Sequence, residues 1–327
     1  MYSGWYTRFP LDRPLTDDER RQAFRRAAEP QVEPDDRAAL IHFNSTYADF
    51  IDRRFRLRGG LGADLGLFAL AVGLGVTAFA WIENINRGGD GWTSEEQRYL
   101  IMSLFTVGML SMIFFVLYML LKDFFTYTHY PIRYNRKTRK IHVFRHNGPG
   151  GVLTVPWEQG YFHLGRGIRN EYALDMRCHV LDGDTVKDTF ATGGIFVTEG
   201  AVHQLWQFIR TYMEEGPAAL GRGHFISMTP ATSLRNCFHM AALYLNIGSM
   251  PLLLALSPLV GLVTLTRWLV MKTSRRPVWP PDIEAESAIE PGDPHVLKEP
   301  GYAGQPYEDD AKLEQAVRLF QRDGSKR

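Results

Sequence analysis

Two long apolar segments joined by a short polar loop dominate the pattern of hydrophobic and polar residues. The first, residues 61–82, has 22 residues and a single charge, Asp64, near its start. The second, residues 99–121, has 23 residues and no charge. A helix rises about 1.5 Å per residue, so each segment is long enough to cross a hydrocarbon core of about 30 Å. The pattern therefore predicts a transmembrane helical hairpin within residues 59–125.

Basic residues are concentrated on the two outer flanks of this hairpin. Arg53, Arg54, Arg56 and Arg58 precede it, and Lys122 and the basic run 133–140 follow it. The connecting loop, residues 83–98, carries more acidic than basic residues, and Trp81 and Trp92 flank the boundary on its side. Short segments rich in Lys and Arg stay cytoplasmic, and tryptophan favours the membrane interface. These features predict a bacterial inner-membrane protein with its N-terminus and main soluble domain in the cytoplasm and its 83–98 loop in the periplasm.

Small residues in the first apolar segment indicate how the hairpin packs. Gly62, Gly66, Gly73 and Thr77 lie near one stripe of the helix. Small residues let two helices approach closely, so we expect this stripe to contact the second helix, with homodimerisation as the alternative. Asp64 lies one turn from the cytoplasmic end, where we expect its carboxylate to reach the interface; an ion pathway is the alternative.

The N-terminal region, residues 1–58, is polar with one more apolar stretch. Thr16 and Glu19 have the spacing of a capping box, which predicts a short helix within residues 17–28. The faces of that helix are mostly charged, so we expect a solvated surface element. Residues 37–57 are more apolar and are interpreted as a strand or helix that packs near the membrane surface.

Residues 126–217 change to short strands with turn signals and are predicted to form a cytoplasmic β-rich domain. The expected strands are 132–134, 140–145, 152–157, 160–164, 172–181 and 185–190. An amphipathic helix over 199–215 follows, ended by Gly216 and Pro217, with an apolar stripe at Val202, Leu205, Trp206, Ile209, Tyr212 and Met213. Antiparallel strands closed by such a helix suggest a pleckstrin-homology-like (PH-like) barrel or sandwich. That comparison concerns the fold alone.

A third apolar region lies within residues 231–273 and is interrupted by Pro251 and Pro258. One full crossing would place the basic residues after Lys272 outside, and two crossings would need about 40 residues. A membrane-associated or re-entrant helical pair, residues 234–247 and 251–270, satisfies both constraints, with one or two crossings as alternatives. The Pro-rich polar tail, residues 274–327, is expected to be loosely ordered. The predicted fold class is therefore a membrane α+β protein.

Composition and motifs argue against an enzyme. The net charge of +1 gives no basic footprint for nucleic acid, and Cys178 and Cys237 are too few for a disulfide framework. The sequence has no Walker A, His-Glu-x-x-His or Gly-x-Ser-x-Gly motif. The histidines of the β-rich region are interpreted as scattered strand and turn residues: His129, His142, His146, His163 and His179. We predict no catalytic residues, no metal and no cofactor.

The best binding-site candidate is the basic run after the hairpin. Its members are Arg133, Arg136, Lys137, Arg139 and Lys140. Cations near the inner leaflet attract anionic headgroups at about 1 kcal/mol each, so these residues are predicted to contact lipid. The alternative is that they only enforce topology.

Several passages resemble a family of uncharacterised proteobacterial membrane proteins that are often encoded beside type VI secretion effectors. The matching passages are residues 127–139, 155–157, 206–217, 267–269 and 277–280. The resemblance implies a non-enzymatic immunity or accessory protein that binds a protein partner, an effector or secretion component, at the membrane. The alternative drawn from the residues is a membrane-anchored module that binds anionic lipid or organises the membrane.

Overall fold

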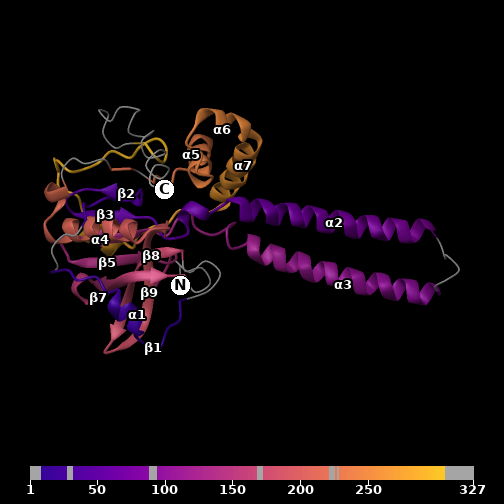
Figure 1. Ribbon diagram of the computed structural model, residues 1–327, viewed down its shortest axis with the longest axis horizontal. Coiled ribbons are helices and arrows are strands. Elements are labelled where there is room, and N and C mark those ends of the chain that lie inside the picture. The colour runs from indigo at the N-terminus through magenta and orange to yellow at the C-terminus, as the bar shows by residue number, and fades with distance from the viewer. Residues whose placement is uncertain are drawn as a thin grey trace.

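The computed structural model describes residues 9–27, 32–87, 94–167, 172–220, 225–226 and 228–305. Trp92 and the end of the tail, residues 306–327, lie outside the described residues. The fold combines a domain built on two antiparallel sheets with a long helical hairpin that projects away from it (Figure 1). A small helical bundle lies beside the hairpin at the end nearest the sheets.

Five strands form one sheet in the order β2-β3-β4-β5-β6, with every neighbouring pair antiparallel. These strands are β2 (Leu40–Phe43), β3 (Tyr47–Phe50), β4 (Ile132–Asn135), β5 (Lys140–Phe144) and β6 (Val152–Pro156). The second sheet has the order β1-β9-β8-β7 and is also antiparallel. Its strands are β1 (Arg13–Pro14), β7 (Gly160–Arg166), β8 (Leu174–Asp182) and β9 (Thr185–Phe196). The six strands expected between residues 132 and 190 are all present.

One hydrophobic core lies between the two sheets and α4 (Glu199–Glu214). The six residues of the expected apolar stripe of α4 are all buried, which confirms the prediction of an amphipathic closing helix. Trp157, Phe50 and Phe162 are among the largest buried side chains, and each such burial stabilises the fold by about 1.5–3 kcal/mol or more. The Tyr134 hydroxyl, 2.7 Å from Thr192 Oγ1, links the two sheets.

The five-stranded sheet joins two regions that the sequence analysis treated separately. Strands β2 and β3 come from residues before the helical hairpin, and β4 comes from residues after it. Tyr47 pairs with Asn135, and Phe50 pairs with Ile132. The N-terminal region 1–58 is therefore not an independent unit, because residues 40–50 complete the domain predicted for 126–217. The hairpin is an insertion between two neighbouring strands.

The hairpin consists of α2 (Leu61–Arg87) and α3 (Glu95–Leu120). Among the described residues these two helices are the ones long and apolar enough to cross a membrane. Gly66 and Gly73 face α3: a Cβ at Gly66 would lie 3.0 Å from Leu120 Cδ2, and one at Gly73 would lie 3.1 Å from Met112 Cε. The Thr77 hydroxyl donates to the Gly73 carbonyl of its own helix at 2.7 Å. Gly62 is exposed, so the expected stripe does not extend to it.

Buried arginines tie the base of the hairpin to the sheets and to the helical bundle. The bundle comprises α5 (Leu234–Tyr244), α6 (Met250–Ala255) and α7 (Ser257–Thr273). Arg267 of α7 is buried and donates to the carbonyl oxygens of Arg58 at 2.6 Å and Phe55 at 3.2 Å. Arg54 forms an ion pair with Asp123 across the two ends of the hairpin. Asp64 is buried at the start of α2 beside Thr266 of α7, which differs from the expected interfacial position.

The described part of the tail, residues 274–305, packs on the domain, in contrast to the loose order expected. Trp279 packs edge-on against Phe144 with ring centroids 5.9 Å apart, and Leu297 N donates to Phe43 O at 3.0 Å. Apolar side chains spaced among the prolines of the tail explain why the tail is ordered, because they cover parts of the five-stranded sheet.

The remaining short elements are α1 (Asp17–Arg21), η1 (Phe55–Leu57), η2 (Trp157–Gln159), η3 (Pro217–Leu220) and α8 (Pro281–Glu286).

Candidate functional site

The short helix α1 places an acidic side chain against the four-stranded sheet. The expected capping box is present: Thr16 Oγ1 accepts from Glu19 N at 3.2 Å, and Glu19 Oε2 accepts from Thr16 N at 2.9 Å. Arg13 adds a second anchor and donates to Glu19 Oε2 at 2.8 Å. The expectation of a wholly solvated helix is wrong at Glu19, which is only 9% exposed. The capping geometry therefore fixes the carboxylate on the side of the helix that faces the sheet.

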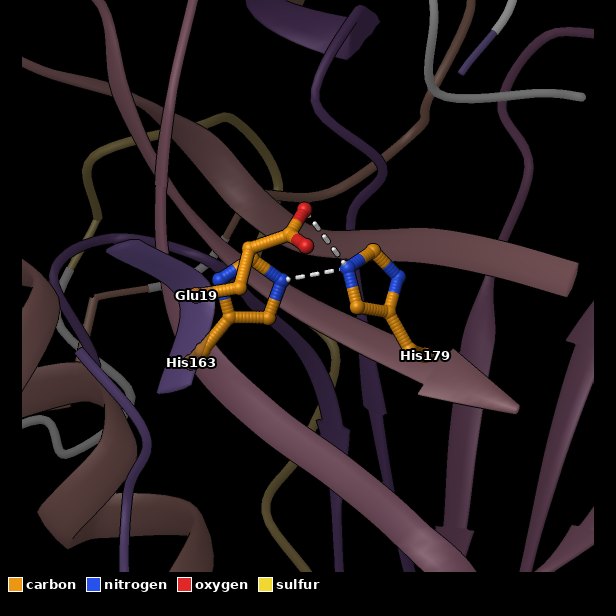
Figure 2. Close-up of side chains that lie close together, drawn as sticks. All are labelled: Glu19, His163 and His179. Atoms are coloured by element: carbon orange, nitrogen blue, oxygen red, sulfur yellow. Dashed lines mark hydrogen bonds and ion pairs between the residues drawn. The ribbon is translucent and has the colours of Figure 1, made fainter. Parts of the chain in front are cut away.

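Two histidines from neighbouring strands meet this carboxylate. Tyr161 of β7 pairs with His179 of β8, so His163, two residues further along β7, lies diagonally from His179 on the same face. The two Nε2 atoms are 2.9 Å apart, and His179 Nε2 is 3.1 Å from Glu19 Oε1 (Figure 2). All three donor atoms lie within 4.8 Å of one another. Both imidazoles are almost completely buried.

The outer ring nitrogens of both histidines have their own partners. His163 Nδ1 is 3.1 Å from the Leu164 carbonyl oxygen, and His179 Nδ1 is 2.7 Å from Thr189 Oγ1 of β9. The Tyr161 ring stacks over the His179 imidazole with centroids 6.5 Å apart, and its hydroxyl donates to the Glu19 carbonyl at 3.2 Å. These contacts hold both rings with their Nε2 atoms directed at each other.

Burial and neighbouring charges set the ionisation of the cluster. Burial lowers the pKa of His163 to about 3, with a further lowering from His179. Burial also lowers the pKa of His179, although Glu19 opposes this shift. Burial of Glu19 disfavours its charged form, but the hydrogen bonds from Arg13 and Thr16 outweigh that effect and hold its pKa well below the usual range. At neutral pH the cluster therefore contains two neutral imidazoles and one carboxylate.

This convergence is not apparent from the sequence, in which the five histidines are interpreted as scattered strand and turn residues. That interpretation fits the other three: His142 is 2.8 Å from Glu286, His129 contacts Thr128, and His146 is exposed. It is wrong for His163 and His179, which form a cluster with Glu19. The capping box at Thr16 is the sequence signal that places Glu19 in the first turn of α1, but it does not show what the side chain contacts. The register between β7 and β8 was not readable, because a loop rather than a two-residue turn connects these strands.

The basic run predicted to contact lipid is paired with acidic and aromatic groups. Arg133 is buried, donates from Nε to Asp49 Oδ1 at 2.8 Å and from Nη2 to Asp49 Oδ2 at 2.9 Å, and lies between the rings of Tyr47 and Trp279. Lys137 pairs with Glu290, Arg139 with Glu158 and Glu214, and Lys140 with Glu286.

Arg136 completes the set, with its guanidinium against Gly216 at the end of α4. Residues 136–139 connect β4 to β5. Four of the five cations therefore have acidic partners within the domain, which offers an alternative to the predicted lipid contact.

The fold defines the class of protein, and the family comparison places the chain in a family. The chain is a mixed α+β protein that carries two helices of membrane-spanning length. It belongs to a family of unknown function, DUF6708, whose model matches residues 109–291. The matched range includes Arg133, His163 and His179, whereas Glu19 lies before its first residue. No curated protein and no solved structure matches the chain.

Proposed function

We propose that this chain is a non-enzymatic inner-membrane protein whose two-sheet domain binds a protein partner at the cytoplasmic face. The observation that carries the proposal is the insertion of the apolar hairpin between β3 and β4 of one sheet. Large apolar side chains are exposed along both α2 and α3, so these surfaces need an apolar solvent. The basic residues at both ends of the hairpin favour a cytoplasmic domain and a periplasmic 83–98 loop.

The way in which the hairpin joins the sheets supports a fixed orientation of the domain. Two chain segments connect hairpin and sheet. Arg54 pairs with Asp123 across them, and the buried Arg267 of α7 donates to the Arg58 carbonyl oxygen. A domain held by two strands of its own sheet has less rotational freedom than one on a single linker. Two antiparallel sheets with the closing helix α4 also support assignment of the domain to the PH-like folds, which often serve as binding modules.

The proposed function depends on holding the binding domain at the membrane. Tethering raises the effective concentration of a binding domain near any partner that reaches the membrane. A type VI secretion effector or secretion component is such a partner, and the chain would act as its immunity or accessory factor. This assignment rests on the resemblance described above.

The helical bundle α5–α7 is assigned to the membrane interface. Its exposed apolar residues include Met250, Leu252 and Leu254 of α6 and Leu262, Leu265 and Leu269 of α7. Helix α7 has 17 residues and contacts α2 near the base of the hairpin. At about 1.5 Å per residue it is shorter than a full crossing, which favours a half-immersed pair over a third span.

The alternative function, a membrane-anchored module for anionic lipid, has weaker support than protein binding, because most of the basic residues from which it was derived have acidic partners in the domain. Arg133 and its neighbours are occupied by Asp49, Glu158, Glu286 and Glu290. We therefore retain protein binding as the proposal.

A growth experiment tests immunity directly. Deleting the gene in a strain that keeps the adjacent effector gene should arrest growth by self-intoxication, and the full chain should restore growth. A variant in which residues 61–121 are replaced by a short Gly-Ser linker should express the domain without its tether and fail to restore growth. Normal growth of the deletion strain contradicts an immunity function. Full restoration by the linker variant contradicts the role of tethering.

A further inference from the structure

The Glu19, His163 and His179 donor atoms are arranged like the ligands of a metal ion. A tetrahedral zinc site has bonds of about 2.0–2.2 Å, which places neighbouring donor atoms about 3.3 Å apart. The His163 and His179 Nε2 atoms are 2.9 Å apart, and His179 Nε2 is 3.1 Å from Glu19 Oε1. An outward movement of a few tenths of an ångström would bring these two separations to the tetrahedral value, and all three donor atoms already lie within 4.8 Å of one another. Two imidazoles and one carboxylate are a ligand set that zinc accepts.

The contacts of the outer ring nitrogens require a lone pair on His163 Nε2 and allow one on His179 Nε2. A backbone carbonyl can only accept, so the Leu164 oxygen requires a proton on His163 Nδ1. Thr189 Oγ1 can accept from His179 Nδ1 or donate to it, and when it accepts, His179 Nε2 carries a lone pair. Metal-binding histidines are oriented by second partners of this kind. With both Nδ1 atoms protonated, three acceptor atoms would face one another: the two histidine Nε2 atoms and Glu19 Oε1. A cation bound among them would satisfy all three.

Arg13 gives the cluster a way to balance charge without the ion. It donates to both oxygens of Glu19 and its side chain is 24% exposed, so it can move toward solvent. Thr16 N would still hold Glu19 Oε2 and leave Oε1 for the ion. The exchange replaces a cationic side chain by a cation, so the carboxylate remains paired in both states.

We propose that Glu19, His163 and His179 form a binding site for a divalent transition metal ion of the zinc type. The ion would clamp α1 to β7 and β8, joining the N-terminal segment to the four-stranded sheet at a point where β7 is an edge strand. A tetrahedral ion with these three ligands has one further position for water. The site is independent of partner binding, so the outcome of the growth experiment does not bear on it.

Cobalt titration of the full chain tests the site. Untagged protein in detergent is treated with EDTA and titrated with Co²⁺, and then with Zn²⁺ as competitor. One equivalent of Co²⁺ should produce the visible absorption of tetrahedral coordination, and Zn²⁺ should abolish it. His163→Gln and His179→Gln should each weaken Co²⁺ binding about tenfold or more. Thr189→Val, which removes only the partner of His179 Nδ1, should weaken it about 10- to 100-fold.

His142→Gln is the matched control, because His142 is also a buried strand histidine paired with a threonine and a glutamate. It should leave Co²⁺ affinity and stoichiometry unchanged. Equal binding by the wild type and the His163→Gln/His179→Gln double variant would overturn the proposal. If the ligand variants fail to fold, native mass spectrometry of the wild type decides the question: one retained Zn²⁺ supports the site, and none at micromolar Zn²⁺ overturns it.

Discussion

Asp49 and Arg133 are direct cross-strand partners in β3 and β4, although the whole helical hairpin lies between them in the chain. Both side chains are buried, and two hydrogen bonds of 2.8 and 2.9 Å join them. The rings of Tyr47 and Trp279 pack on the guanidinium, with centroids 3.9 and 4.8 Å from its central carbon. The pair therefore joins β3 to β4, the two strands between which the hairpin is inserted.

Removing one charge of this pair should destabilise the domain strongly. In Asp49→Asn the buried Arg133 guanidinium loses its nearest counter-charge and keeps only the longer, 3.7 Å ion pair with Glu284; breaking a buried pair typically costs about 3–5 kcal/mol. The free energy of unfolding, measured in detergent by denaturant titration with tryptophan fluorescence, should fall by that order. Glu290→Gln breaks the exposed pair with Lys137 and should cost about 1 kcal/mol or less. Equal losses in the two variants would contradict the role assigned to the buried pair.

The packing of α2 on α3 should depend on which glycine is enlarged. A side chain at Gly73 meets Met112 and Ile113, whereas a Cβ at Gly75 has nothing within 4 Å. Gly73→Leu should therefore destabilise the hairpin by about 1–3 kcal/mol through overpacking, and Gly75→Leu should be close to neutral. Thermal unfolding in detergent measures the difference. If Gly75→Leu were the more damaging variant, a contact between copies of the chain through that face would be the better explanation.

The proposed topology can be checked with single cysteines, because Cys178 and Cys237 are both buried. Glu95→Cys, in the first turn of α3, should react with a membrane-impermeant maleimide in intact spheroplasts. Glu290→Cys, on the domain, should react only after lysis. The reverse pattern would place the domain outside. Protease added to spheroplasts should likewise spare residues 130–217.

Asp36 should make stability fall as the pH rises. Burial raises the pKa of its carboxyl to about 8, with a further increase from Asp35, while Arg56 and the Ile226 N–H oppose it. The folded state therefore binds a proton that the unfolded chain releases near pH 4, so stability decreases between about pH 4 and pH 8 and then levels off.

Asp36→Asn keeps the shape of the side chain and removes its titration. The variant should be more stable than the wild type at pH 8, and the difference should shrink toward pH 5. Unfolding at several pH values, with the wild type as reference at each, isolates this contribution from those of other groups. A difference that did not change with pH would contradict the assignment.

The local elements were largely readable from the sequence, and their long-range pairing was not. Alternation and turn residues identify β4 to β9, and the capping box at Thr16 identifies α1. The pairing of β3 with β4 is not local, because the intervening helices carry no information about the register of the strands around them. For this reason the sequence of residues 37–57 is compatible with either a strand or a helix.

The same limit applies to both site assignments. Ile132 and Tyr134 point into the core, so alternation alone puts Arg133 on the other face of β4. That face of β4 is buried because the tail packs on it, with Trp279 and Glu284 in contact with Arg133. For His163 and His179 the missing facts were the β7–β8 register and the docking of α1. Both are tertiary contacts between segments that are well separated in the chain.

The insertion of α2 and α3 between β3 and β4 also dictates an order of events during synthesis. Strands β2 and β3 leave the ribosome first, but the neighbour of β3 in the sheet is translated only after both apolar helices. The edge of β3 therefore stays unpaired until α2 and α3 have both been synthesised. Under the proposed topology the hairpin enters the bilayer during this interval, and until β4 arrives the nascent domain presents an open strand edge that favours aggregation.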